Sequence, residues 1–389
     1  MRIAHVSDCY FPRLGGIERQ VNDLAERQHA LGHDVDIITA VAGSEPDEGP
    51  VRIVRPKRGL ARATSMRTIG AFLLGGKTVA RADYDVLHLH VSALSMMTYR
   101  AAQIGSRLGI PCVITAHSLW DYTTPIFKAS DAMLRWSEWP ITWSAVSSVA
   151  ADSLRSCLGP DRPIGILPNG IDRDAWRIQP KPRDPKRVVV ASVMRLAHRK
   201  RPHQLLQMMR QAREQVPDDI RLELVIIGDG PRRPAIERDI RRHGMSDWVT
   251  LTGRATHQQI RHIYADVDFA VAPATLESFG IAALEARCAG LPVVAHASSG
   301  VRDFVSHGRE GLLAVGDDDM ARCIAQLASS PDLLAAMRAH NRNSAPDLDL
   351  GWPDVLDRCS QLYASAGAPV AELDVADPEA DEQMFGTAG

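Results

Sequence analysis

Short apolar runs alternate with longer amphipathic segments along most of the chain, and this alternation limits the possible folds more than any other feature. The runs of the amino-terminal half occupy residues 3–6, 35–39, 86–89 and 113–115. Those of the carboxyl-terminal half occupy residues 188–193, 222–227, 249–251, 270–271 and 292–295. Apolar strands separated by helices are typical of parallel sheets with crossover connections. The pattern therefore predicts an α/β protein with two doubly wound parallel sheets.

The segments between the runs carry apolar residues at helical spacing. The clearest predicted helices cover residues 17–31, 203–215, 233–243, 257–264, 281–289, 320–328 and 352–363. Three prolines among charged residues, Pro180, Pro182 and Pro185, predict a linker between the two halves. The length of 389 residues also suits two domains.

These signals predict a division of the chain into five parts. Two Rossmann-like domains are expected at residues 1–175 and 188–350, with a linker at 176–187. Residues 351–363 are predicted to form a helix that packs back toward the first domain. Residues 364–389 carry six acidic side chains and no Lys or Arg, which predicts a disordered tail. The cleft between the two domains is the expected ligand site.

The composition excludes several classes of protein. A hydrophobic fraction of 45%, a charged fraction of 24% and a net charge of −2 are typical of a globular chain. The apolar runs are shorter than the about 20 residues that cross a bilayer. No signal-peptide pattern opens the chain, and the six cysteines form no CxxC pair, so we expect a cytoplasmic protein with reduced thiols. A nucleic-acid partner is disfavoured because the total charge is not basic.

Two glycines, Gly15 and Gly16, directly precede the first predicted helix. Glycines at such a position let backbone N–H groups approach an anion at the positive end of the helix. The alternative is a tight strand-to-helix turn that needs unusual backbone angles. The spacing is not GxGxxG, so both interpretations stay open.

Three cations, Arg195, Arg199 and Lys200, follow the predicted strand at residues 188–193. Ligands of α/β proteins bind where such strands end. Cations at this place would suit a diphosphate, whose charge they would neutralise in the cleft. The alternative is a solvated basic turn.

Two glutamates, Glu277 and Glu285, bracket a loop that enters a helix near Gly280. Eight helical residues span ~12 Å, so each carboxylate could accept hydroxyl protons from a different sugar of one ligand. The alternative makes Glu277 a capping residue and Glu285 a surface residue. The apolar neighbours Leu284 and Cys288 weaken that alternative for Glu285.

His117 follows the predicted strand at residues 113–115. It could bind a substrate hydroxyl or stabilise charge, and the alternative is a structural role.

Several pairs of aspartates could in principle hold a divalent cation. They occur at residues 34 and 36, 266 and 268, 317–319, and 347 and 349. Because two of these pairs lie in or beside apolar strands, where alternate residues face outward, we expect no metal site.

The motifs of the chain occur in the order of a known family. They are Gly15-Gly16, Leu167-Pro168-Asn169-Gly170-Ile171-Asp172, Gly228-Asp229-Gly230-Pro231, the pair Glu277/Glu285 within ESFGIAALEA, and Gly290-Leu291-Pro292-Val293-Val294. Over residues 1–363 the chain resembles the retaining GT-B glycosyltransferases of family 4, or group 1, which include phosphatidylinositol mannosyltransferases. The resemblance implies two Rossmann-like domains facing each other across a cleft, the first for the acceptor and the second for the nucleotide-sugar donor.

The resemblance also implies roles for individual residues. Arg195 and Lys200, helped by Arg199, would hold the donor diphosphate, with Gly15 and Gly16 near the donor. The other implied donor contacts are Glu277 at the sugar, Glu285 at the ribose, Ser278, Phe279, Gly280 and Ile281 at the phosphates, and Leu251, Thr252, Gly253 and Arg254 at the base. His117 would lie near the transferred sugar, and the implied catalytic residues are His117, Arg195, Lys200 and Glu277. The chain departs from the family pattern at Met194 and Arg201, where glycine is usual, and at Ser299 of a glycine pair.

The activity implied by the resemblance is transfer of a hexose, of the mannose or glucose type, from a GDP- or UDP-linked sugar to a hydroxyl acceptor. It would proceed with retention and without a metal or other cofactor. The cations and the helix start would stabilise charge on the leaving phosphate, which would take the acceptor proton on the same face. A nucleotide-sugar epimerase or a phosphorylase-like enzyme is the alternative on the same fold, and a non-enzymatic nucleotide-sugar binder is a further one.

The stretch from Arg52 to Arg81 combines eight cations with apolar residues and contains no acid. Such a segment could dock on an anionic lipid surface, at ~1 kcal/mol per cation. This interpretation predicts a peripheral protein at the inner face of the plasma membrane, with a glycolipid or cell-envelope glycan as acceptor. The alternative is a solvated helix face with one side in the core.

Overall fold

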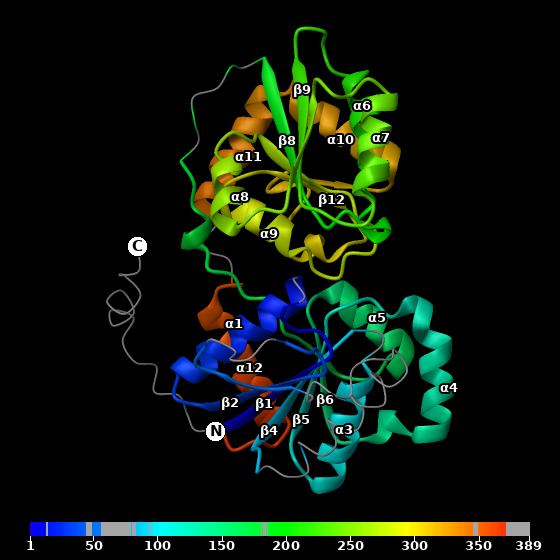
Figure 1. Cartoon of the computed structure of the whole chain (residues 1–389), viewed down its shortest axis with the longest axis vertical. Helices are drawn as coiled ribbons and strands as arrows, with labels where there is room; N and C mark the ends of the chain where they lie inside the picture. Colours follow the sequence, from blue (N-terminus) through cyan, green and yellow to red (C-terminus); the bar gives the residue numbers. More distant parts are fainter. Residues whose placement is uncertain are drawn as a thin grey trace.

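The computed structural model describes residues 1–12, 15–43, 49–55, 79, 83–92, 95–179, 181, 184, 186–344 and 349–370. Two α/β units lie end to end along the long axis of the molecule (Figure 1). Each unit contains one parallel sheet with helices packed against it. The predicted fold class, two Rossmann-like doubly wound units, is confirmed.

The first unit contains a sheet with the strand order β3-β2-β1-β4-β5-β6-β7. Its strands are β1 (Arg2–Ser7), β2 (Asp34–Thr39), β3 (Arg52–Val54), β4 (Val86–Val91), β5 (Cys112–Ala116), β6 (Ile141–Ala145) and β7 (Ile164–Ile166). Its helices include α1 (Gly16–Ala30), α3 (Met96–Leu108), α4 (Thr124–Leu134) and α5 (Ser148–Leu158). The strand order reverses between β1 and β4, and a ligand crevice is expected at the carboxyl ends of these strands.

The second unit repeats this plan with the strand order β10-β9-β8-β11-β12-β13. Its strands are β8 (Arg187–Val193), β9 (Arg221–Ile227), β10 (Val249–Gly253), β11 (Phe269–Ala272), β12 (Val293–His296) and β13 (Gly311–Ala314). Its helices are α6 (Pro202–Arg213), α7 (Arg233–Arg242), α8 (His257–Tyr264), α9 (Ile281–Cys288), α10 (Asp317–Ser329) and α11 (Pro331–Ser344). Here the order reverses between β8 and β11. The predicted strands and helices all form, whereas the strands β3, β6, β7 and β13 were not predicted.

The first helix illustrates how the sequence sets the bounds of an element. Gly15 precedes α1 in an extended conformation, and Val21 and Leu24 of the apolar stripe are buried in the core. The helix ends where Gly32 adopts a φ of 85°, and its N–H donates to the carbonyl of His29. A left-handed residue at this place is a common helix stop that favours glycine.

The last helix, α12 (Trp352–Ser365), leaves the second unit and packs on the first. Figure 1 shows it in orange-red beside the blue α1. Trp352 and Tyr363 of this helix share a buried cluster with Ile3 and Ile37 of the first sheet. Burial of each large apolar side chain stabilises the fold by roughly 1.5–3 kcal/mol, so α12 anchors the chain end to the first unit.

The expectation for the aspartate pairs in or beside strands was wrong in part. Asp36 is buried, accepts hydrogen bonds from Arg52 and from the hydroxyl of Tyr84, and does not face outward. Asp268 is also buried and accepts from Arg338 at 3.1 Å. These carboxylates are therefore occupied by structural partners.

Several predicted segments lie outside the described residues. They are residues 56–78 and 80–82 of the basic stretch, the three linker prolines, and residues 371–389 of the acidic tail. Within the described ranges, every helix is too short or too polar to cross a bilayer.

Candidate active site

The loop after β8 carries Arg195, and the Gly228-Asp229-Gly230-Pro231 motif holds its backbone. The N–H of Met194 donates to Ile227 at 2.9 Å, and the N–H of Leu196 donates to Asp229 at 3.0 Å. A Cβ atom on Gly228 would overlap the carbonyl oxygen of Met194, so the two loops pack too closely for a side chain there. The motif thus fixes the backbone on which the exposed side chain of Arg195 stands.

Lys200 lies one turn further along, and its ammonium group forms an ion pair with the carboxylate of Glu277. Both groups are half-buried, and Arg199 beside them is exposed. Two residues that were predicted to contact the same donor are therefore brought together, and each neutralises the other. A diphosphate would offer Lys200 a stronger partner.

The departure from the family pattern at Arg201 has a structural explanation. Arg201 adopts a φ of 58°, the left-handed conformation that favours glycine. Its guanidinium donates to the carbonyl of Pro273 at 3.1 Å and pairs with Asp317 at 2.7 Å. These bonds hold the side chain in place and offset the backbone strain.

The loop from Glu277 to Gly280 is held from both units. The hydroxyl of Ser278 donates to the carbonyl of His117 at 2.7 Å, and the hydroxyl of Ser147 donates to the carbonyl of Ser278. On the other side, the N–H of Gly300 donates to Glu277 at 2.9 Å. A Cβ atom on Gly300 would overlap the carbonyl of Ser278, so this glycine of the Ser299-Gly300 pair is required by close packing.

The helix that follows this loop starts at Ile281, not at Glu277. Gly280 precedes it with a φ of 97°, and Phe279 is buried against Phe304. The separation of ~12 Å expected for an unbroken helix from Glu277 to Glu285 therefore does not apply. In the described part of the chain, the N–H group of Ile281 donates to no partner, as is usual for the first residue of a helix.

The Gly15-Gly16 pair lies directly opposite this helix start. A Cβ atom on Gly16 would lie 3.0 Å from Cδ1 of Ile281, and one on Gly15 would overlap the carboxylate of Glu18. The first unit and the second unit therefore approach each other at Gly16 and Ile281. Neither glycine has a positive φ, so the alternative of a turn that needs unusual backbone angles was wrong. The close approach to Ile281 favours a small residue at Gly16.

Glu285 is buried, with only 7% of its surface exposed, so the surface alternative was wrong. Loss of hydration raises its pKa to about 8, and the nearby positive charge of Arg19 partly opposes this effect. Its Oε1 lies 3.5 Å from Nε2 of His257, which Arg19 contacts from the first unit. Arg19 and His257 were not predicted as site residues, because neither belongs to a motif.

The residues predicted to border the base lie at the end of β10. Leu251 is partly buried, and Thr252 and Arg254 are exposed. The carbonyl of Gly253 accepts the N–H of Gly228 at 2.8 Å, which joins this strand end to the loop that supports Arg195. These residues therefore lie at the same edge of the second sheet as the cations.

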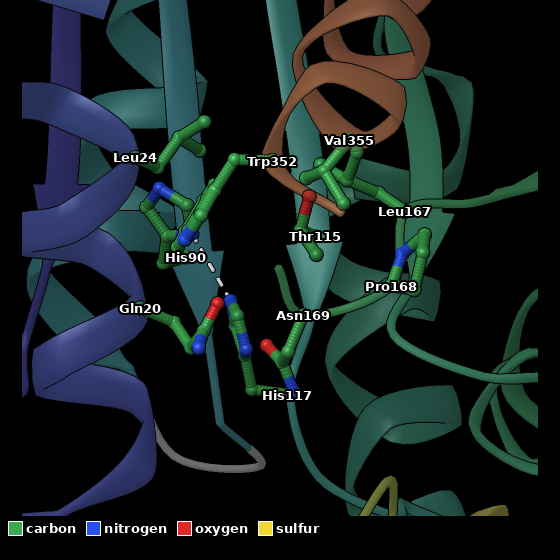
Figure 2. A pocket seen from close by; sticks show the side chains of 10 residues that line it. All are labelled: Gln20, Leu24, His90, Thr115, His117, Leu167, Pro168, Asn169, Trp352 and Val355. Carbon is green, nitrogen blue, oxygen red and sulfur yellow. Dashed lines mark hydrogen bonds between the residues drawn. The ribbon is translucent and has the colours of Figure 1, made fainter. Parts of the chain in front are cut away.

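His117 follows β5 at the corresponding edge of the first sheet and is 8% exposed. Burial lowers its pKa to about 4, so the ring is neutral at pH 7. Its Nε2 lies 3.0 Å from Nδ1 of His90 on β4. Both rings border a small cavity in the first unit (Figure 2), lined by Gln20, Leu24, His90, Thr115, His117, Leu167, Pro168, Asn169, Trp352 and Val355.

The first three residues of the motif at residues 167–172 line this cavity. Leu167, Pro168 and Asn169 form one wall, and residues of α1, α12, β4 and β5 together with His117 form the rest (Figure 2). The centre of a water molecule can occupy about 20 Å³ of it, enough for about one water. His117 stands between the side chains of Gln20 and Asn169 in Figure 2.

Among the described residues, one cluster has the composition of a metal site. The ring nitrogens of His5, His88 and His90 lie within 4.8 Å of one another. However, all six of their ring nitrogens already take part in hydrogen bonds. These bonds account for the cluster without a metal ion.

Comparison with known proteins covers both units. The sequence model of "Glycosyltransferase Family 4" matches residues 14–175, and that of "Glycosyl transferases group 1" matches residues 172–344. The phosphatidylinositol N-acetylglucosaminyltransferase gpi3 subunit of Schizosaccharomyces pombe is 24% identical, over 92% of this chain and 80% of that protein. The GDP-mannose-dependent alpha-(1-6)-phosphatidylinositol monomannoside mannosyltransferase of Mycobacterium tuberculosis is 26% identical, over 88% and 92%.

A solved structure shares the fold along almost the whole chain. HepE of Anabaena, in complex with UDP and glucose, superposes with a TM-score of 0.73 over 94% of this chain and 100% of that one. The sequence identity is 18%, so this similarity concerns the fold alone. The two units thus have the GT-B arrangement.

Proposed function

Since this chain belongs to the group 1 glycosyltransferases of family 4, we propose that it moves a hexose of the mannose or glucose type from a nucleotide-diphosphate sugar to a hydroxyl acceptor. Transfer would retain the anomeric configuration and need no metal ion. The observation that carries the proposal is the junction of Lys200, Glu277 and the start of α9 at the cleft.

The donor is proposed to lie on the second unit, with its diphosphate at this junction. Arg195 and Lys200 would neutralise the diphosphate, and the free N–H of Ile281 would donate to a phosphate oxygen. Negative charge grows on the leaving phosphate in the transition state, and donors already in place stabilise it most. The complex of HepE with UDP and the GDP-mannose dependence of the mycobacterial relative support a UDP- or GDP-linked donor.

The ends of the donor are assigned to the two glutamates and the strand end of β10. Glu277 would contact the transferred sugar and Glu285 the ribose hydroxyls, with residues 251–254 beside the base. Phe279 would act by holding the loop, because its ring is buried in the core. Gly15 and Gly16 would close over the donor from the first unit, where Gly16 already approaches Ile281.

The reaction requires that water is excluded and that the acceptor hydroxyl is aligned with the anomeric carbon of the donor sugar. The bond from the anomeric carbon to the leaving phosphate would break on the face that the acceptor attacks. The acceptor oxygen would form its bond to the anomeric carbon on that same face, which retains the configuration, and the leaving phosphate oxygen would take the acceptor proton. His117 would contact the transferred sugar from the first unit.

The acceptor is proposed to be a lipid-linked hydroxyl, such as a glycolipid or cell-envelope glycan, because the relatives act on phosphatidylinositol derivatives by name. We assign acceptor binding to residues 1–175, donor binding to residues 188–350 and the link to residues 176–187. Docking on an anionic membrane through the stretch from Arg52 to Arg81, at the inner face of the plasma membrane, belongs to the same proposal. Nothing in the family match or the relatives favours the epimerase or phosphorylase alternative.

The test is a thermal-shift titration of the full chain with GDP-mannose, UDP-glucose and UDP-GlcNAc. A donor at 100 times its Kd should stabilise the protein by ~2.7 kcal/mol. Arg195→Ala should abolish the shift, whereas Arg322→Ala, an exposed arginine of α10, should keep it. The preferred donor is then incubated with an alcohol acceptor or inorganic phosphate, and stabilisation by no donor, or transfer to phosphate alone, contradicts the proposal.

A further inference from the structure

A continuous chain of eight hydrogen bonds runs through the interior of the first unit and ends at His117. It passes through β4, β5, β6, β1, α1 and α12, and every member is buried. From one end to the other, the bonds are Ser144 Oγ–Ile114 O (3.0 Å), Thr115 Oγ1–Ser144 Oγ (2.7 Å), His88 Nε2–Thr115 Oγ1 (2.8 Å), Tyr363 Oη–His88 Nδ1 (2.9 Å), Gln28 Nε2–Tyr363 Oη (3.1 Å), His5 Nε2–Gln28 Oε1 (2.6 Å), His90 Nε2–His5 Nδ1 (2.9 Å) and His117 Nε2–His90 Nδ1 (3.0 Å).

The first bond sets the direction of those that follow. A carbonyl oxygen only accepts, so the hydroxyl of Ser144 must donate to Ile114. A hydroxyl has one hydrogen, and that of Ser144 is now used. Thr115 must therefore donate to Ser144, and Nε2 of His88 must carry a proton and donate to Thr115.

The direction then passes through the carboxyl-terminal helix. Burial lowers the pKa of His88 well below its ordinary value, so the ring is neutral and its Nδ1 is an acceptor. Tyr363 Oη lies 2.9 Å from this nitrogen, whereas Cys359 Sγ lies 3.8 Å from it, so the hydroxyl of Tyr363 is the closer donor. The oxygen of Tyr363 then accepts from Gln28, whose NH₂ group also contacts Cys359 Sγ at 3.5 Å. The amide of Gln28 therefore directs its NH₂ group at Tyr363 and its carbonyl oxygen at His5.

The last three bonds extend this donor-to-acceptor order to His117. Burial lowers the pKa of His5 to about 4 and that of His90 well below its ordinary value, so both rings are neutral. Because the oxygen of Gln28 accepts, Nε2 of His5 donates and its Nδ1 accepts from His90. By the same rule, Nδ1 of His90 accepts from His117, whose proton is then on Nε2.

We propose that Gln28, His5, His90 and Tyr363 are positioning residues that hold His117 as the neutral tautomer protonated at Nε2, with Nδ1 as an acceptor for a ligand hydroxyl. Among the described residues, none binds Nδ1 of His117, and the ring borders the cavity of Figure 2. This inference rests on the proposed function in one respect, namely that the hydroxyl belongs to the donor sugar. In this proposal His117 is a neutral hydrogen-bond acceptor and does not act as a cation.

The chemistry of histidine explains why such a device is useful. A free imidazole exchanges its proton between two nitrogens, and only one of the two forms accepts at Nδ1. Fixing one form before the ligand arrives removes the need to select it during binding. Through this chain of hydrogen bonds, Tyr363 of the carboxyl-terminal helix α12 influences the tautomer of His117.

The first experiment measures the tautomer without any assay of activity. The full-length protein is labelled with ¹⁵N-histidine, and His117→Asn identifies the signals of His117 in a spectrum that correlates ring nitrogens with carbon-bound protons. Nitrogen shifts distinguish protonated from unprotonated ring nitrogens. We expect a protonated Nε2 and an unprotonated Nδ1, unchanged from pH 5.5 to 8. A proton on Nδ1, or titration of His117 near pH 6.5, would overturn the proposal.

The second experiment compares two substitutions of similar size at the middle of the chain. His90→Asn keeps an oxygen near the place of Nδ1 and can still accept from His117, whereas His90→Leu cannot. We expect His90→Leu to give a mixture of His117 tautomers and to lower kcat/KM for the donor about 10- to 100-fold. His90→Asn should keep the single tautomer and restore most of the lost activity.

The outcomes separate this inference from the proposed function. Equal loss of activity in both variants, or a single unchanged tautomer in His90→Leu, overturns the positioning role. If no donor or acceptor supports transfer by the native protein, the proposed function fails, but the spectrum of the ligand-free protein still decides whether the chain fixes His117.

Discussion

The two sides of the cleft bear polar groups that are built in opposite ways. On the second unit, Lys200 and Arg195 are charged, stand at strand ends and remain accessible to water. On the first unit, His117 and the chain behind it are buried and neutral. A charge costs little where water or a ligand of opposite charge can reach it, whereas a buried polar group must be neutral and hydrogen-bonded. The difference shows that the second unit contributes charged groups, whereas the first unit contributes neutral groups whose hydrogen bonds have a fixed direction.

The largest effect is expected from breaking the charged side. Lys200→Ala should lower kcat about 10²- to 10³-fold, because it removes a cation from the developing charge on the leaving phosphate and leaves Glu277 unpaired. Steady-state kinetics with the preferred donor measures this loss. Lys181→Ala removes a different ion pair, with Asp266, and should keep native rates. Native turnover in Lys200→Ala would mean that the charged side does no catalytic work.

A second prediction concerns Glu285, a buried acid of the second unit. Its pKa is raised to about 8, so the folded state binds the proton more tightly than the unfolded state does. Between about pH 4.5 and pH 8 the native protein keeps this proton and the unfolded chain does not, so the stability falls as the pH rises. Glu285→Gln should be more stable than the native protein at pH 8, on the order of 2 kcal/mol, and equal to it near pH 4.5.

Denaturant unfolding at several pH values checks the prediction for Glu285. Glu237→Gln, on the partly exposed face of α7, serves as the control and should show no such trend. A constant difference between Glu285→Gln and the native protein across this pH range would contradict the prediction. The same variant should bind the donor more weakly above about pH 8, where the native Glu285 is a carboxylate and both of its oxygens can accept from the ribose hydroxyls.

A third prediction removes one hydroxyl from the neutral side. Tyr363→Phe deletes the bond to His88 and leaves the amide of Gln28 without this partner. Loss of buried hydrogen bonds of this kind should destabilise the fold by about 1–2 kcal/mol. Urea unfolding measures the change, and Tyr99→Phe, which loses one bond of 3.3 Å to a carbonyl, should have the smaller effect. An equal or larger effect of Tyr99→Phe would show that the chain adds little to stability.

The smallest expected effect is that of ionic strength, to which the charged groups of the second unit should respond and the neutral groups of the first unit should not. Raising the ionic strength from about 0.05 to 0.5 M should weaken nucleotide binding about three- to tenfold, because the cations that hold the diphosphate are accessible to water. The tautomer of His117 should not change, because its partners are buried and neutral. Calorimetry and the histidine spectrum provide the two measurements, and a salt-dependent tautomer would remove the distinction between the sides.

The alternation of apolar runs was sufficient to predict both sheets, because parallel strands buried on both faces need continuous apolar sequence. The glycine motifs were also recognisable in the sequence. Glycine is required where two backbones pack too closely for a Cβ atom, as at Gly228 beside Met194. The start of α9 after Gly280 was predicted correctly, but the distance of ~12 Å between Glu277 and Glu285 assumed helix from Glu277 onward, whereas α9 begins only at Ile281. Arg19 and His257 carried no signal, since they meet Glu285 only when the two units come together.

The sequence by itself thus determined the two α/β units, the cations after β8 and the family. Only the tertiary structure decided which groups are charged and in which direction the neutral ones donate. His5, His88 and His90 occur as isolated polar residues within apolar strands, and β1 and β4 bring them side by side next to Tyr363, which follows His5 by more than 350 positions in the chain. The physical reason is that hydration and hydrogen-bond partners set the state of a titratable group, and both are properties of the folded neighbourhood, not of the residue.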